Sequence, residues 1–425
     1  MQELLELIRA QKAGRALGIP SVCSAHPLVL EAAVQDARER GDHVLIEATC
    51  NQVNQFGGYT GLTPHAFVEQ VRAIATRAGL PFERVLLGGD HLGPNPWKAD
   101  AAPKALDAAA GMVAEYVRAG FRKIHLDCSM SCAGDPRALA DGEIARRAAE
   151  LCAVAEDTWR AVGGPPPVYV VGTEVPSPGG ATEDLGTLAV TKTGSVDETL
   201  IAHRAAFAER GLEATWPRVI ALVVQPGVEF DHHRVIDYIA SEAAALRARI
   251  ESEPGLVYEA HSTDYQTPER LQALVADHFA ILKVGPALTF ALREALWALD
   301  CLERAWHGEH EASLQTIVLR AMHSDPRHWQ PYYTDAARRE LDMQFSLSDR
   351  IRYYWSVPDV ARACEALLQR LGSASIPLGL LSQFVPKQTT RIRAGAIAND
   401  PHAIVLDAVG DVLRQYATAC GRTRH

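Results

Sequence analysis

The sequence predicts an α/β protein of the (β/α)8 class, a TIM barrel with an appended helical region at its C-terminus. Three observations predict this fold: short runs rich in β-branched residues recur eight times, the runs are apolar without alternation, and helical patterns separate them. Uninterrupted apolar runs are typical of parallel strands that are buried on both faces. Eight strand–helix repeats favour closure into a barrel over an open, doubly wound sheet, which is the main alternative.

The first predicted element is a short amphipathic helix over residues 1–13, which carries charges of both signs. The eight predicted strands follow, and each ends in polar residues: 19–23, 44–47, 85–88, 123–127, 168–172, 219–224, 256–259 and 280–284. The helical patterns between them cover residues 64–78, 105–119, 141–161, 197–209 and 268–277.

The strand pattern ends after residue 284. A long helix is predicted over residues 288–305, and further helices over 314–323, 336–341, 360–371 and 404–420. We therefore expect residues 1–310 to form the barrel and residues 311–425 to form a helical extension that packs on it.

Composition excludes several classes of protein. The formal net charge of -10 argues against nonspecific nucleic-acid binding, which needs a basic surface. The eight cysteines form no CxxC pair, so we expect reduced thiols and a cytoplasmic protein. No signal peptide and no uncharged stretch of 18 apolar residues is visible, so no membrane partner is expected.

Polar side chains gather at the mouth of the barrel, the end where the strands' C-termini converge. A barrel stabilised only by its core has no reason to place so many ionisable groups at one end. They are Ser24, His26, Glu47, Asn51, Gln52, Asp90, His91, Asp127, Ser129, Glu174, Gln225, Glu259, His261 and Lys283.

Two of these histidines suggest a metal site. His91 and His261 could supply imidazole ligands, and Glu174 or Gln225 an oxygen ligand, for a divalent ion such as Zn2+, Mn2+ or Mg2+. Such an ion would polarise a ketose carbonyl as a Lewis acid. The alternative for each histidine is a hydrogen-bonded residue of the barrel rim, and that structural role is expected for His125, which lies inside a strand.

Candidate phosphate contacts lie in two glycine-rich loops and in one C-terminal segment. The loops cover residues 57–61 and 178–180, and neither matches the GxxxxGK[ST] pattern of a P-loop kinase. Arg350 and Arg352 precede an aromatic cluster and could hold a sugar phosphate over the mouth. The alternative is an ordinary helix start with Asp349 near its N-terminus.

Several of these segments closely resemble the GatZ/KbaZ family. The similar segments are SVCSAHP at 21–27, EAT and NQVNQFGGYTG within 47–61, GGDHLGPN at 88–95, GTEVP at 172–176, VQPGVEF at 224–230, YEAHSTDYQ at 258–266 and KVGPALT at 283–289. The resemblance implies a non-catalytic subunit of class II D-tagatose-1,6-bisphosphate aldolase, a family that has also been labelled tagatose-6-phosphate kinase. Some members are described as D-tagatose 6-phosphate 4-epimerases, which form D-fructose 6-phosphate.

A more distant similarity connects the mouth with the catalytic class II aldolases. Asp90-His91 resembles their acid/base aspartate followed by a zinc-ligand histidine, and the turn at Glu259-Ala260-His261 resembles the site of another ligand histidine. Their remaining ligand histidine would fall near Gln225. This difference puts aldolase-type zinc binding in doubt and is compatible with a differently built metal site, or with none.

Two hypotheses about function follow. In the first, the chain is an epimerase that cleaves and re-forms the C3–C4 bond of a phosphorylated ketohexose, with Asp90 and Glu174 as acid/base groups and Lys283 stabilising oxyanions. In the second, it is a stabilising subunit for an aldolase's catalytic chain. A homo-oligomer is expected in either case. Substrate contacts are predicted for Ser24, Glu47, Asn51, Gln52, Asp127, Glu259, Arg350 and Arg352.

Overall fold

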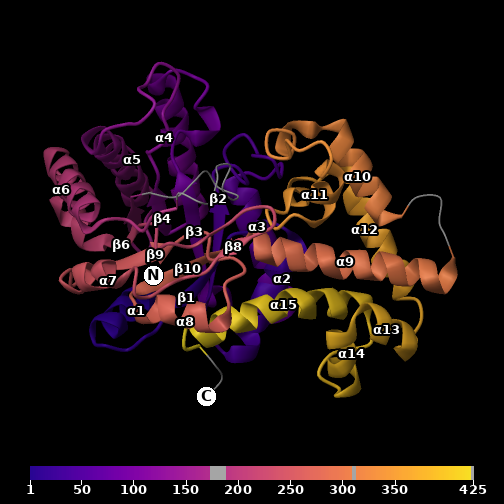
Figure 1. Ribbon diagram of the computed structural model, residues 1–425. Helices are drawn as coiled ribbons and strands as arrows, with labels where there is room; N and C mark the ends of the chain where they lie inside the picture. The colour runs from indigo at the N-terminus through magenta and orange to yellow at the C-terminus, as the bar shows by residue number, and fades with distance from the viewer. Residues whose placement is uncertain (173–187, 309–312, 423–425) are drawn as a thin grey trace.

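The computed structural model describes residues 1–172, 188–308 and 313–422, and it confirms the predicted barrel (Figure 1). Eight parallel strands close in the order β1-β10-β9-β6-β5-β4-β3-β2. Each coincides with one of the eight predicted runs: β1 Ile19–Val22, β2 Val44–Thr49, β3 Val85–Leu92, β4 Lys123–Leu126, β5 Val168–Val171, β6 Val219–Val223, β9 Val257–Ala260 and β10 Phe279–Val284. A small antiparallel sheet that the sequence did not predict, β7 Glu229–Phe230 with β8 Val235–Ile236, lies between β6 and β9 in the chain.

Helices of the outer ring alternate with the strands. They are α2 Pro27–Arg40, α3 Pro64–Ala78, α4 Ala102–Ala119, α5 Asp141–Val162, α6 Thr193–Glu209, α7 Ala244–Glu251 and α8 Pro268–Ala276. Several begin with a proline after a capping side chain, as where Thr63 accepts from the Ala66 N–H, and end at a left-handed glycine such as Gly79. The helices α2 and α7 were not among the predicted ones.

The N-terminal helix α1, Gln2–Lys12, closes the bottom of the barrel, opposite the mouth. Its buried side chains Leu4, Leu7 and Ile8 join a core cluster with inward-facing strand residues such as Leu45 and Ile220. The amphipathic pattern of the first residues thus reflects burial of one face against the barrel interior.

The C-terminal region is helical, as predicted. Its α-helices are α9 Pro286–His307, α10 Leu314–Ser324, α11 Arg339–Phe345, α12 Pro358–Leu371, α13 Leu378–Phe384, α14 Pro386–Arg393 and α15 Pro401–Ala419. Short 3-10 helices cover Phe82–Arg84 (η1), Asn95–Trp97 (η2), Glu213–Arg218 (η4), Pro326–His328 (η5) and Arg350–Tyr353 (η6). Across residues 1–172, 188–308 and 313–422, no helix has the length and apolarity that crossing a bilayer requires.

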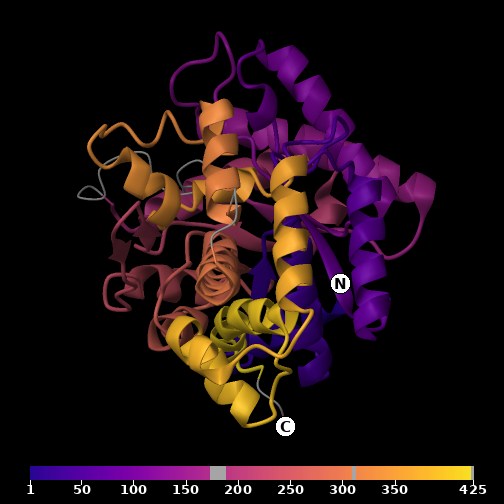
Figure 2. The ribbon, with the colours of Figure 1, turned by 90° about the vertical axis from the view of Figure 1, so that its right-hand side faces the viewer.

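The last helix returns to the barrel. It contacts α2, α8 and α9, and Figures 1 and 2 show it alongside α9. Because α2 and α8 are the first and last helices of the ring, α15 fills the place of an eighth outer helix. The end of the chain therefore completes the barrel wall, and the division of the chain near residue 310 stays a prediction.

Candidate active site

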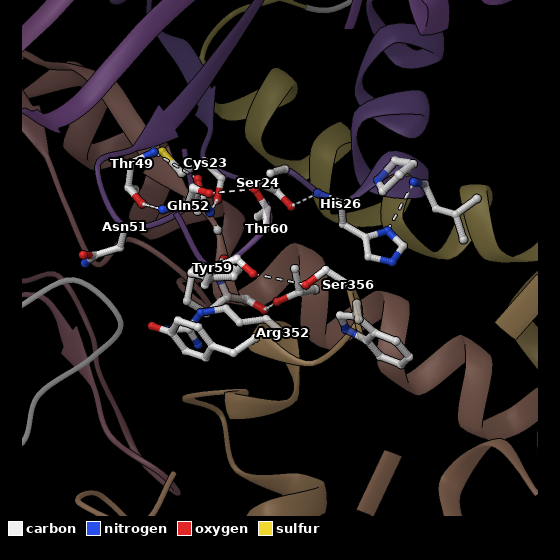
Figure 3. A pocket seen from close by; sticks show the side chains of 18 of the residues that line it. Cys23, Ser24, His26, Thr49, Asn51, Gln52, Tyr59, Thr60, Arg352 and Ser356 are labelled. Atoms are coloured by element: carbon white, nitrogen blue, oxygen red, sulfur yellow. Dashed lines mark hydrogen bonds between the residues drawn. The ribbon is translucent and has the colours of Figure 1, made fainter. Parts of the chain in front are cut away.

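A cavity of about 550 Å³ opens at the mouth of the barrel. Its wall combines the ends of β1, β2, β3, β9 and β10 with the C-terminal segment around η6. In Figure 3, Ser24 and Gln52 lie on one side of this space, and Arg352 and Ser356 face them from the C-terminal region. Of the predicted site residues, those that line the cavity are Ser24, Asn51, Gln52, Asp90, His91, His261, Lys283 and Arg352.

A buried ion-pair network forms the floor of the cavity. Lys123 Nζ lies 2.6 Å from both Glu47 Oε1 and Glu259 Oε2, and all three side chains are fully buried. Lys283 Nζ lies 2.8 Å from Glu47 Oε2 and 2.8 Å from Asp90 Oδ1. Gly88 on β3 leaves room for this arrangement, because a Cβ there would lie 2.7 Å from Glu47 Cγ. Sequence reasoning missed Lys123, although a lysine within an apolar run buried on both faces is a recognisable signal.

The network keeps Asp90 and Lys283 charged despite burial. Burial alone would raise the pKa of Asp90, but His91 and Lys283 hold it well below its ordinary value. Burial likewise opposes the charged form of Lys283, yet its carboxylate neighbours hold its pKa well above the ordinary value. The network contains three carboxylates, those of Glu47, Asp90 and Glu259, against two ammonium groups, so one negative charge remains to attract a cation.

Three imidazoles and a carboxylate converge above this floor. Asp90, His91, His125 and His261 each offer one ligand atom, and these four atoms all lie within 4.8 Å of one another. The ring centroid of His91 lies 5.1 Å from that of His125 and 4.8 Å from that of His261. His125, whose place in the strand suggested a purely structural role, thus belongs to the cluster.

Each imidazole has a ring nitrogen that contacts a neighbouring oxygen, and both nitrogens of His125 are engaged, since its Nδ1 accepts from the His91 N–H at 3.2 Å and lies 3.0 Å from Asp90 Oδ1. His91 Nδ1 lies 2.6 Å from Asp127 Oδ2, His125 Nε2 lies 3.0 Å from the Gly172 carbonyl, and His261 Nε2 lies 3.0 Å from Glu259 Oε1. Partners of this kind fix ring orientation and tautomer at metal sites. Burial lowers the pKa of His261 to about 4, so its imidazole is neutral, as a ligand must be. Burial also opposes a charged His91, but Asp90 and Asp127 raise its pKa above the ordinary value, so His91 must release a proton to bind an ion. The donor set and the surplus negative charge fit a divalent ion such as Zn2+.

Gln225 lies elsewhere in the structure. Its side-chain oxygen accepts from the backbone N–H groups of Gly227, at 2.8 Å, and Val228, at 3.0 Å, and so stabilises the turn after β6. Neither the cavity wall nor the histidine cluster, within the part of the chain that the structure describes, includes Gln225. The predicted acid/base residue Glu174 and the loop 178–180 lie outside the described residues.

Four of the predicted substrate contacts, Glu47, Asp127, Glu259 and Arg350, do not line the cavity. Glu47 and Glu259 belong to the buried network, and Asp127 supports His91. The two arginines of η6 differ: Arg352 lines the cavity, whereas the guanidinium carbon of Arg350 lies 3.2 Å from the centre of the Tyr332 ring.

Arg352 is held in place from several sides. Its Nη1 donates to the carbonyls of Ser348 and Asp349, and its Nη2 donates to the Tyr353 hydroxyl at 3.2 Å. Tyr353 in turn contacts Tyr59, at 4.6 Å between ring centroids, so the C-terminal segment closes on the loop after β2. Tyr59 and Thr60 of the predicted glycine-rich loop line the cavity (Figure 3).

Gly58 makes this loop possible. It has a positive φ of 55°, and a Cβ there would lie 2.4 Å from the Gln52 carbonyl oxygen. The loop folds back so that the Thr60 hydroxyl donates to the same carbonyl at 2.7 Å.

The chain is similar to known proteins over nearly its whole length. Residues 4–421 match the family model described as D-tagatose-1,6-bisphosphate aldolase subunit GatZ/KbaZ-like. The chain is 50% identical over 417 residues, 98% of each chain, to the D-tagatose-1,6-bisphosphate aldolase subunit GatZ of Klebsiella pneumoniae. The crystal structure of a probable tagatose 6 phosphate kinase from Sinorhizobium meliloti is similar with a TM-score of 0.88 and 49% identity, over 95% of this chain and 100% of that one.

Proposed function

Because this chain belongs to the GatZ/KbaZ-like family of D-tagatose-1,6-bisphosphate aldolase subunits, we propose that it serves as a subunit of a class II D-tagatose-1,6-bisphosphate aldolase beside a separate catalytic chain. The observation that supports this most is 50% identity to the Klebsiella pneumoniae subunit over 98% of both chains. A subunit recognises its partner through its outer surface, and the similarity extends over the full length of both chains.

Co-expression with a class II aldolase catalytic chain tests this proposal. We expect the two chains to elute together in size-exclusion chromatography, and the aldolase half-life at a fixed temperature to lengthen when this chain is present. Separate elution and an unchanged half-life would refute the subunit proposal.

The cavity favours a second candidate function, which is epimerisation of D-tagatose 6-phosphate to D-fructose 6-phosphate. The specific observation is the Asp90, His91, His125 and His261 cluster. A stabilising subunit has no physical need for a desolvated cluster of this kind, since burial of ionisable groups costs free energy.

We propose His91, His125 and His261 as the residues that would hold a divalent ion, with His125 in the place first suggested for Gln225 and Asp90 beside them as an acid/base group. When bound, the ion would supply Lewis-acid polarisation of the ketose carbonyl. Zn2+ suits the three imidazoles, and Mn2+ or Mg2+ would be the alternative.

The chain's own side chains would do the remaining work. Lys283 reaches the cavity wall as a charged ammonium and would stabilise negative charge that develops on a sugar oxygen. Arg352 would hold the phosphate, since a guanidinium forms paired hydrogen bonds with phosphate oxygens. Asp90 stays proposed as one acid/base group and Glu174 as another.

A turnover assay on the purified chain tests the second candidate. We expect conversion of D-tagatose 6-phosphate to D-fructose 6-phosphate, and loss of most of it in Asp90→Asn. No conversion with added Zn2+, Mn2+ or Mg2+ would refute the epimerase candidate and leave the subunit proposal standing.

A further inference from the structure

Asp264 is a buried carboxylate in the cavity wall, and the chemistry proposed above gives it no role. It follows β9 and is 3% exposed, and it lines the same cavity as His91, His261 and Lys283. Its Oδ1 accepts from the Gly285 N–H at 2.9 Å and from the Ala287 N–H at 2.8 Å, at the start of α9. Two backbone hydrogen bonds therefore fix the position of this carboxylate.

Asp264 differs from the other acids of the site in having no ion-pair partner. Asp90 is paired with Lys283, Asp127 with His91, and both glutamates of the floor with lysines. No ion pair joins Asp264 to any residue in the ranges 1–172, 188–308 and 313–422. Burial raises the pKa of Asp264 to about 6, although the backbone hydrogen bonds from Ala287 and Gly285 oppose the rise.

Helix capping alone does not require a carboxylate here. A neutral Ser, Thr or Asn side chain satisfies the first N–H groups of a helix as well as Asp does, without the desolvation of a charge. The position is also one where TIM barrels commonly bind a phosphate group, at the start of a helix after the last strands. Asp264 fills that position with negative charge, which disfavours a phosphate at the start of α9.

We propose that Asp264 is a catalytic acid/base residue that exchanges a proton with the C4 hydroxyl of the ketose phosphate. The inference rests on the epimerase candidate above. The Asp264 carboxylate takes the hydroxyl proton, the O–H electron pair forms the C4 carbonyl, and the C3–C4 bond breaks. Its electron pair passes to C3 and the C2 carbonyl oxygen as an enediolate. The aldehyde turns, C3 attacks its other face, and Asp264 returns the proton to the C4 oxygen, so atoms and electrons balance.

The charged and titratable groups near Asp264 come from several elements. Arg352 of η6 lowers its pKa, and Glu229 of β7 is an acid that interacts with it. The others are Tyr265 beside it in the chain, Tyr416 of α15, and His261 and Lys283 on the same cavity wall. Of these groups only Arg352 shifts the pKa of Asp264 appreciably, and its effect is smaller than the rise caused by burial.

Asp264→Asn tests the proposal, because an amide can still accept the two backbone hydrogen bonds but cannot take a proton. We expect kcat for D-tagatose 6-phosphate to fall by roughly 10²- to 10⁴-fold, with KM changed by less than about threefold, and the acidic limb of the kcat profile to disappear. The matched control is Asp300→Asn. Asp300 is also buried and accepts from two backbone N–H groups at a helix start, those of Leu314 and Gln315, but it lies outside the cavity wall.

The outcomes separate this inference from the function on which it rests. Wild-type protein without turnover would refute the epimerase candidate, and this inference with it. Wild-type turnover that Asp264→Asn retains would overturn the inference alone. An equal loss of kcat in Asp264→Asn and Asp300→Asn would assign Asp264 a purely structural role and overturn it as well.

Discussion

Replacement of Lys123 by Met tests whether the buried floor of the cavity is held by charge. Met keeps the length and apolar stem of the side chain and removes only the ammonium group. In the wild-type structure that group lies 2.6 Å from Glu47 Oε1 and 2.6 Å from Glu259 Oε2. Burial alone would lower the pKa of Lys123, but Glu259 and Glu47 raise it above its ordinary value, so the lysine is charged at any physiological pH.

The expected loss follows from the burial of the three groups. Removing one partner of a buried ion pair leaves an uncompensated charge and costs about 3–5 kcal/mol. Unfolding entropy is about 2.1 cal/mol/K per residue, which for 425 residues gives about 0.9 kcal/mol/K. Lys123→Met should therefore lower Tm by about 3–6 °C.

Differential scanning calorimetry measures this shift. Lys104→Met is the matched control, because Lys104 also pairs with an acid, Asp100 at 2.9 Å, but its side chain is 76% exposed. A surface pair contributes about 0–1 kcal/mol, so the control Tm should fall by about 1 °C or less. The double variant Lys123→Met with Glu259→Gln should lose less than the two single losses added together. A Lys123→Met protein as stable as the control would refute the charged floor.

Three further predictions concern the acid on β7, the phosphate contact and the metal cluster. Burial raises the pKa of Glu229 from 4.5 to about 7, so the native state binds the proton more tightly than the unfolded state, and stability falls as pH rises through that window. Glu229→Gln should remove this pH dependence and stabilise the protein at pH 8 by at most about 3 kcal/mol. Urea unfolding at several pH values measures the effect. Arg352→Leu should weaken binding of D-fructose 6-phosphate by roughly 10- to 150-fold, since hydrogen bonds to charged groups contribute about 1.5–3 kcal/mol. Binding of D-fructose, which has no phosphate, should not change. Isothermal titration calorimetry measures both affinities, and equal weakening of both would contradict a phosphate contact. His125→Ala should lower Zn2+ affinity roughly tenfold or more, whereas Gln225→Ala should leave it unchanged. Competition with a chelating dye measures both affinities. A loss in Gln225→Ala but not in His125→Ala would restore Gln225 as the ligand.

The sequence by itself determined the barrel. Each strand is a local apolar run and each helix a local periodic pattern, so all eight strands could be located without knowledge of any long-range contact. The direction of the strands also placed Asp90, His91, His261 and Lys283 at one end, because parallel strands in a barrel share their C-terminal edge. Local pattern likewise indicated the helical C-terminal region.

Only the tertiary structure decided which of these residues meet. Glu47 and Lys283 are 236 positions apart and touch because β1 pairs with both β2 and β10 when the barrel closes. The same closure turns His125 toward the histidine cluster, whereas Gln225 is taken up by its own turn. Side-chain direction at a strand end depends on strand register and on backbone turns, which arise from contacts across the barrel and leave no mark on the local sequence.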